Sequence, residues 1–286
     1  MSRVRLTLGE RLEAPLDGSP LAPGRICGRP REEIAGVRLR HGNREEPLGE
    51  LFDVELSGET DDADRRLELT GDLGACDRLG EAMEGGTLVV DGDAGDHLGA
   101  RMSGGSVAVR GSAGSWCGAE MTGGVIRIEG SVGRRAGAAY PGSRHGMNRG
   151  VILVEGDAGP RLGETMRRGL IAVRGRAARH AGAHLVAGSL FLLGGSEGPV
   201  GAAMRRGTIL ATGEPELLPG FRYACSSPST GGGSGSATIF RWRSGWRPAP
   251  TGATAATSPS SDGAKCSCWT NERREDLHVT WTLRHV

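Results

Sequence analysis

The sequence lacks long apolar runs. None approaches the about 20 residues that a membrane-spanning helix needs, so no such helix is expected. The opening residues, MSRVRLTLGERLEAP, contain no apolar signal-peptide core, so a cytoplasmic protein is the default expectation. Neither sign of charge is in excess, because 35 Lys and Arg face 34 Asp and Glu and leave a net charge of +1. The totals therefore favour neither nucleic acid nor a membrane as a partner.

Clustered cysteines are also lacking. The six cysteines form no C-x-x-C pair, and none stands near a histidine at metal-ligand spacing, so we expect no iron–sulfur or structural zinc site. No Ser/His/Asp or paired-carboxylate arrangement stands out either, so no catalytic residue is expected. The cysteines are predicted to be small buried side chains. They are Cys27, Cys76, Cys117, Cys225, Cys266 and Cys268.

Glycine, by contrast, is abundant, with 50 residues, and it recurs at a fixed period. From about Glu84 to Gly213, marker glycines stand 19 residues apart, with one step of 26 that implies a 7-residue insertion. A period near 20 with glycines at fixed phase predicts a stacked solenoid. The markers are Gly86, Gly105, Gly124, Gly150, Gly169, Gly188 and Gly207.

Each coil repeats the same apolar pattern. The second and fourth residues after every marker are apolar and the residue between them varies, which predicts a β-strand with one buried face. Glycines after each strand and again seven residues later suit tight corners, where φ is positive or backbones approach closely. The pattern predicts an all-β fold, a parallel β-helix of about 19 residues per coil. A methionine column (Met83, Met102, Met121, Met147, Met166, Leu185, Met204) and a second column from Leu98 to Val200 form the opposite inner wall.

The sequence divides into three parts. Residues 1–64 do not repeat; they contain a strand at 4–8, a Pro- and Gly-rich loop from Pro15 to Pro30, and a short helix within 31–42 that ends near Gly36. This segment has few apolar residues, so we expect it to cap the open end of the solenoid. Residues 65–225 form the β-helix. Residues 226–286 break the composition and predict an irregular, disordered tail.

Candidate contact residues lie in the insertion and at one phase of the repeat. Insertions in solenoids map to loops, often on a contact face. Arginines opening several coils at one phase predict a basic column that docks an acidic partner or an anionic cofactor side chain, with a solvated corner as the alternative. His180 and His184, in HAGAH, are interpreted as surface residues because neither a helix nor an adjacent Glu accompanies them. The partner-contact candidates are Tyr140, Arg144, His145, Asn148, Arg149, Arg167, Arg168, Arg205 and Arg206.

The units GGTLVVDGDAGDHLGARM and RRGLIAVRGRAARHAGAHL resemble a known β-helix superfamily. One branch is the C-terminal domain of glutamate synthase large subunits. The other comprises the C subunits of formylmethanofuran dehydrogenase and of the bacterial formyltransferase/hydrolase complex. The insertion, PGSRHGMN, and the stretch HGNREEPLGELFDVE (41–55) are similar to these C subunits. The resemblance covers about residues 35–225 and implies a single-stranded, right-handed β-helix.

The resemblance also implies a function. The chain would be a non-catalytic scaffold in C1 metabolism, where formyl groups pass between tetrahydromethanopterin and methanofuran-type carriers and leave as formate. An amidohydrolase-like subunit and a formyltransferase subunit would be its partners and would carry the chemistry, and this chain would bind no cofactor itself. The alternative is a structural subunit of a glutamate-synthase-like amidotransferase. An acyltransferase β-helix, with 18 residues per coil, fits the 19-residue period less well, and an adhesive solenoid would want a signal peptide.

The tail has a second interpretation. It holds four of the five tryptophans and Lys265, the only lysine. Back-translation of Thr251 to Glu272 in a shifted frame yields RRYRRYFAELGRGEVLVLDQR, which resembles the C-terminal ending of the same C-subunit family. A frameshift is therefore the alternative to a disordered tail, and it would leave the last coils uncapped.

Overall fold

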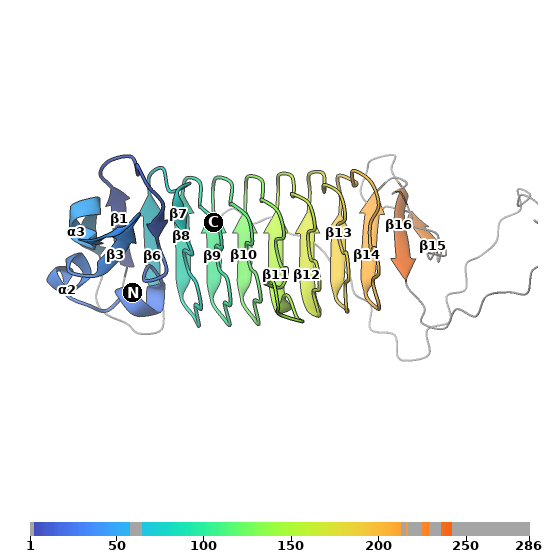
Figure 1. The fold of residues 1–286 in the computed structure, drawn as a ribbon, viewed down its shortest axis with the longest axis horizontal. Helices are drawn as coiled ribbons and strands as arrows, with labels where there is room; N and C mark the ends of the chain where they lie inside the picture. Colours follow the sequence, from blue (N-terminus) through green and yellow to red (C-terminus); the bar gives the residue numbers. More distant parts are fainter. Residues whose placement is uncertain (1–2, 58–64, 213–215, 217–224, 229–235, 242–286) are drawn as a thin grey trace, which may run out of the picture. The chain divides into compact units, whose positions relative to one another are not determined.

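The computed structural model describes residues 3–57, 65–212, 216, 225–228 and 236–241. Within these ranges most elements are strands, joined by three short helices (Figure 1). The helices are Pro23–Ile26 (α1), Arg31–Ala35 (α2) and Leu48–Leu51 (α3). The strands are Arg3–Leu8 (β1), Leu16–Asp17 (β2), Arg38–His41 (β3), Arg44–Pro47 (β4), Phe52–Ser57 (β5), Arg66–Thr70 (β6), Cys76–Asp77 (β7), Thr87–Asp91 (β8), Ser106–Val109 (β9), Val125–Ile128 (β10), Asn148–Val154 (β11), Arg168–Val173 (β12), Ser189–Leu192 (β13), Thr208–Thr212 (β14), Cys225–Pro228 (β15) and Ser236–Arg241 (β16).

A stack of parallel strands confirms the predicted β-helix. The strands β6 and β8 to β14 lie in this order in one sheet, and each neighbouring pair among them is parallel, so one strand of every coil joins a single sheet (Figure 1). The register follows the repeat, since Leu88 pairs with Val107 and Val107 with Ile126. A second line of parallel bridges, from Leu73 through Ala94 to Ser196, runs along another side of the coils. The irregular first coil ends at Met83 and joins the stack through β6.

The predicted apolar columns form one continuous core. Both strand columns and the methionine column are at most 2% exposed, as is the opposite wall from Leu98 to Val200. Corner glycines make this packing possible. Gly118 has a φ of +62°, and a Cβ there would lie 2.6 Å from Cδ1 of Ile152, closer than atoms can pack. Residues that repeat every 19 positions therefore form the columns that fill the interior.

The N-terminal segment extends the same sheet. Strand β1 pairs in parallel with β6 and antiparallel with β5, which confirms the predicted strand at 4–8. Helix α2 ends at Ala35 with Gly36 as its C-cap, again as predicted. The predicted loop from Pro15 to Pro30 was partly wrong, because β2 and α1 lie within it, and β2 pairs with β7 of the first coil. The domain bounds themselves stay predictions.

The predicted irregular tail also contains structure that the sequence did not reveal. Strand β16 pairs antiparallel with β14, the last parallel strand, and β15 pairs antiparallel with β16. An antiparallel strand therefore follows the parallel stack at this end, as β5 follows β1 at the other. The window from Thr251 to Glu272, on which the frameshift interpretation depends, lies outside the described residues.

Candidate partner-binding surface

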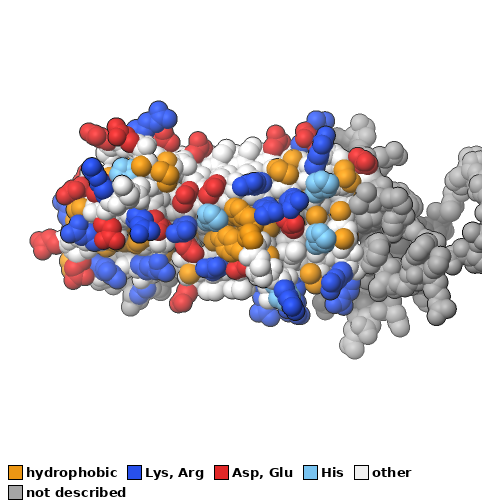
Figure 2. All heavy atoms as spheres, in the orientation of Figure 1, with side chains coloured by type: hydrophobic (Ala, Val, Ile, Leu, Met, Phe, Trp, Pro, Cys, Tyr) orange, Lys and Arg blue, Asp and Glu red, His pale blue; other side chains and the backbone are white. Residues whose placement is uncertain are grey.

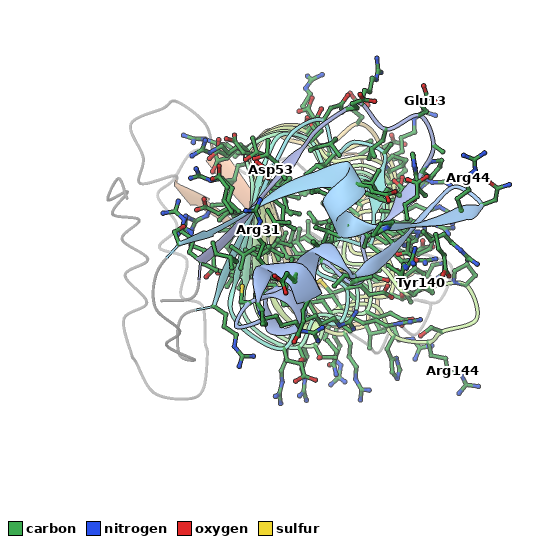
Figure 3. The ribbon with its side chains drawn as sticks, turned by 90° about the vertical axis from the view of Figure 1, so that its left-hand side faces the viewer. Glu13, Arg31, Arg44, Asp53, Tyr140 and Arg144 are labelled. Carbon is green, nitrogen blue, oxygen red and sulfur yellow. The ribbon has the colours of Figure 1, made fainter. Side chains whose placement is uncertain are left out.

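The insertion leaves the coil after Ala138 and rejoins it at Met147. The amide of Met147 donates to the carbonyl of Gly137 at 3.0 Å, and the amide of Gly146 donates to the carbonyl of Thr165 at 3.1 Å, so both ends are fixed to the stack. Between them, residues 141–145 are exposed. Figure 3 shows Tyr140 against the body and Arg144 pointing outward beyond it. The insertion is thus an exposed loop on a fixed base.

Tyr140 holds this loop against the coils. Its hydroxyl and Nδ1 of His97 share a hydrogen bond of 2.8 Å. Its ring stacks on Trp116 with centroids 5.2 Å apart, and Trp116 in turn stacks on His97 at 6.3 Å. Below the rings lie three alanines that are 0% exposed, although they belong to a cluster separate from the main core. These are Ala100, Ala119 and Ala138.

Arginines and carboxylates surround the aromatic rings. The guanidinium of Arg101 lies 5.2 Å from the Tyr140 centroid, and that of Arg135 lies 4.8 Å from the Trp116 centroid, both within the range of cation–π attraction. Arg101 also pairs with Glu120 at 3.3 Å. Burial and the nearby carboxylate of Glu81 raise the pKa of Tyr140 to about 12, so its hydroxyl stays protonated at neutral pH. Figure 2 shows hydrophobic side chains gathered at the middle of one face, bordered by charged ones.

The backbone presents these side chains at strained positions. His97, Trp116 and Arg101 have φ values of 64°, 63° and 56°, in the left-handed region that residues other than glycine rarely adopt. Ladder hydrogen bonds hold them there, as when the amide of His97 donates to the carbonyl of Ser115 at 2.8 Å. The same two positions of the coil are left-handed along the stack, so they form two outward rows of non-glycine residues.

The predicted basic residues are exposed, but the predicted column is partly wrong. Arg144, Arg149, Arg167, Arg168, Arg205 and Arg206 are all exposed, and in the described part of the chain none forms an ion pair. The ladder pairs Arg168 with Asn148 rather than with Arg149, because the register shifts between Asn148 and Val151. Val186 and Ala187 fill the coil between the two arginine pairs, so the column is interrupted.

The other predicted contact residues are divided between surface and interior. His145 is exposed, and its Nδ1 contacts the carbonyl oxygen of Arg144 at 2.7 Å. Asn148 is half-buried, and its Oδ1 is buried without a hydrogen-bond partner among the described residues. Whether any of these residues contacts a partner stays a prediction.

A solved structure matches this architecture over most of its length. It is a chain in the crystal structure of the formyltransferase/hydrolase complex (FhcABCD) from Methylorubrum extorquens in complex with methylofuran. The TM-score is 0.70 and the sequences are 32% identical, over 79% of this chain and 83% of that one. The chain belongs to the family of formylmethanofuran dehydrogenase C subunits.

Curated members of this C-subunit family give the same assignment over a shorter stretch. The chain is 36% identical over 95 residues to the C subunit of the tungsten-containing formylmethanofuran dehydrogenase 2 of Methanothermobacter wolfeii. It is 35% identical over 83 residues to the C subunit of the molybdenum-containing formylmethanofuran dehydrogenase 1 of Methanothermobacter thermautotrophicus. These alignments span only 34% and 20% of the relatives' lengths. No family model matches the chain.

The cysteines of this family member lie inside the fold. Cys27, Cys76 and Cys117 are buried and unpaired, which confirms the prediction for these three; the other three lie outside the described side chains. Burial raises the pKa of the Cys117 thiol to about 12, and the pKa of Cys76 is raised for the same reason. Such thiols are poor nucleophiles. The described ranges contain no group of three or more His, Cys, Asp or Glu placed to hold a metal, and no helix in them is long and apolar enough to cross a membrane.

Sequence reasoning found Tyr140 but missed the residues that hold it. From the sequence, His97 is interpreted as a single histidine in a turn, and no sequence pattern singles out Trp116. A signal exists, because these two residues share one phase of the repeat, 19 residues apart, and Arg101 follows four residues after His97. The period predicts that residues at one phase are neighbours, so an aromatic next to a histidine on that column indicates a surface cluster.

Proposed function

We propose that this chain is a β-helix scaffold subunit, without an active site of its own, in a formyltransferase/hydrolase or formylmethanofuran dehydrogenase complex. The observation that carries the proposal is the match over 83% of a chain in the FhcABCD structure. That complex is described as a formyltransferase/hydrolase bound to methylofuran. Sequence relatives in two Methanothermobacter species are named as C subunits of formylmethanofuran dehydrogenase.

In the proposed complex, a formyl group passes from tetrahydromethanopterin to a methanofuran-type carrier and leaves as formate after hydrolysis. The formyltransferase and amidohydrolase-like subunits carry these steps and bind both carriers. The present chain supplies a rigid surface. A stack of hydrogen-bonded coils with one continuous core deforms little, so it can hold two partners at a fixed separation.

The insertion and the exposed arginines are the proposed contacts. Arg144 and His145 project from a loop that Tyr140 fixes to the coils, so the loop need not be ordered on binding. Exposed arginines that form no ion pair with the described residues can pair with carboxylates of a partner and steer its approach. They are Arg149, Arg167, Arg168, Arg205 and Arg206.

Co-expression tests this function. The tagged chain is produced together with the formyltransferase and amidohydrolase-like subunits encoded in the same genome and is purified through its tag. We expect all three to elute as one species with formyltransferase and formate-releasing activity. Elution of the chain alone, while the other subunits assemble without it and work at full rate, contradicts the proposal. Retention of a glutamate-synthase chain instead supports the amidotransferase alternative.

A further inference from the structure

The outward side of the parallel sheet changes character along the stack. Strands β9 and β10 each place a polar residue outward, Ser106 and Arg127 respectively. In β11 to β13 the apolar runs are instead continuous, with VILV at 151–154, LIAV at 170–173 and LFLL at 190–193. Alternation is typical of a strand with one covered face, whereas a continuous apolar run is typical of a strand covered on both faces. The sequence of the later strands therefore favours a cover on their outward side.

The fold places these outward apolar residues next to one another. On neighbouring strands, Val151 pairs with Leu170. Leu153 pairs with Ala172, which in turn pairs with Phe191 (Figure 1). Paired strands lie about 4.8 Å apart, so the side chains form continuous rows across three coils. The set, named the late sheet face, is Val151, Leu153, Leu170, Ala172, Phe191 and Leu193.

None of the side chains in the late sheet face is buried. Leu193 is 45% exposed, and the other five are half-buried. Their inward neighbours, such as Ile152 and Ile171, are 0% exposed, so the contrast between the two sides of each strand is complete. The described residues therefore leave a contiguous apolar surface on the outside of these coils. Such a surface with a charged border is typical of a protein interaction site.

Arginines border the late sheet face where its strands begin. Arg149 on β11 and Arg168 on β12 each stand two residues before the apolar run, and both are exposed. Neither forms an ion pair with the described residues. Just after β11, by contrast, Glu155 is already paired with Arg174 at 2.8 Å. The apolar rows are thus flanked by positive charge that the described part of the chain does not neutralise.

The early part of the same sheet is satisfied within the chain. The hydroxyl oxygens of Thr87 and Ser106 share a hydrogen bond of 3.2 Å across neighbouring coils. Glu68 on β6 accepts hydrogen bonds from Arg3 and Arg66. Polar groups that already have partners gain little from a further cover, whereas apolar surface is stabilised by leaving water. A cover is therefore expected over β11 to β13 and not over β6 to β9.

We propose that the late sheet face binds an apolar segment of a partner subunit that carries carboxylates along one edge. Burial of the leucine and phenylalanine side chains supplies affinity, and carboxylates opposite Arg149 and Arg168 fix the orientation. A second copy of this chain fits less well, because Glu155, the carboxylate beside these rows, is already paired. The inference deepens the proposed function and rests on it for the identity of the partner.

Affinity measurements on reconstituted complexes test the proposal. The tagged chain is immobilised and titrated with the co-purified formyltransferase and amidohydrolase-like subunits. Leu153→Glu places a charge within the apolar rows and Phe191→Ala removes their largest side chain, and each should weaken binding at least about tenfold. Ala108→Glu introduces the same charge at the equivalent outward position of β9, so this matched control should leave the affinity unchanged. Thermal melts of the free variants check that folding is retained.

A photoreactive phenylalanine analogue at position 191 identifies the occupant, and it keeps an aromatic ring there. A cross-link to a partner segment that contains Asp or Glu beside apolar residues supports the proposal. A cross-link to another segment of this chain or to a second copy overturns it.

The outcomes for the inference and for the proposed function differ. If the wild-type chain binds the partner subunits and Leu153→Glu binds them equally well, the inference fails and the proposed function stands. If the wild-type chain binds neither subunit, the proposed function fails, and the partner inferred here fails with it.

Discussion

The coils beside the insertion and the last described coils repeat one backbone pattern, yet their outward side chains differ. Beside the insertion, Arg101 pairs with Glu120, Arg135 pairs with Glu164, and Tyr140 packs against a cluster of buried alanines. In the coil that begins at Gly207, the preceding residues Arg205 and Arg206 are exposed and have no ion-pair partner among the described residues. The same backbone thus presents different side chains in different coils.

Inward-facing and outward-facing residues of the coils also differ in how much they vary. Apolar columns continue through both regions without change, because every coil must fill the same interior. Outward residues are free to change from coil to coil. Variation in outward residues is therefore informative about binding, whereas variation in inward residues is constrained by packing.

The largest expected loss of stability comes from a substitution in the core. Ile152 is 0% exposed and pairs with Ile126 and Ile171, so Ile152→Ala should cost about 2–5 kcal/mol of unfolding free energy. Leu153, the next residue on β11, faces outward and is half-buried, so Leu153→Ala should cost roughly 1 kcal/mol or less. Urea denaturation of both variants checks this. Equal losses would show that the core does not follow the predicted alternation.

The next largest effect is expected at Tyr140, which contacts Trp116 and His97. Tyr140→Ala removes a ring stacked on Trp116 and should cost about 2 kcal/mol, whereas Tyr140→Phe removes only the hydrogen bond to His97 and should cost about 1 kcal/mol. Denaturation gives both values. Hydrogen exchange should show faster exchange of the loop amides in Tyr140→Ala. Unchanged exchange would mean that Tyr140 does not hold the insertion.

A pH effect on stability is expected at Glu68, a carboxyl bonded by three arginines. Burial opposes ionisation of Glu68, but hydrogen bonds from Arg3, Arg66 and Arg5 outweigh it and keep the pKa of that carboxyl below its ordinary value. Its contribution to stability is therefore fully present above the ordinary carboxyl pKa and is lost as the pH falls through the lowered, folded-state pKa.

The variant Glu68→Gln tests this contribution. It should lose about 1 kcal/mol at neutral pH and differ less from the wild type in acid. Denaturation at a series of pH values measures the difference. A gap between wild type and variant that stays constant down to the most acidic folded conditions would contradict the assignment.

The smallest expected effect on stability is at the exposed arginines. Arg167→Ala and Arg205→Ala should each change the unfolding free energy by less than about 0.5 kcal/mol, because neither residue has an ion-pair partner in the described structure. If the residues face a partner, each variant should instead weaken complex formation and reduce its salt dependence. Binding titrations at two ionic strengths test this, with Arg127→Ala as the control.

The sequence predicted the coils because period and burial are coupled. Every coil repeats the spacing of Leu88, Val90 and Gly99, so the ladder, the core and the corners followed from one measurement of period. Register was less predictable. The shift that pairs Arg168 with Asn148 arises from the way the insertion re-enters the stack, and spacing alone does not reveal this.

The surface was harder to predict for a different reason. Contacts among His97, Trp116 and Tyr140 depend on which way a seven-residue insertion folds, and the sequence does not encode that direction as a period. Strands β15 and β16 were missed because the surrounding Ser, Gly and Thr residues give no alternation. Regular parts of the fold could be inferred, and the parts that interrupt the repeat needed the structure.

Hydrogen exchange on the chain, alone and within the reconstituted complex, tests the central claim most directly. If the outward departures from the repeat bind partners, amides of the exposed insertion at 141–145 and of the segment at 178–186 should become protected in the complex. Amides of β9 should not change, because the ladder already protects them. Protection confined to the sheet face of β8–β10, with none at the insertion or at 178–186, would contradict the account.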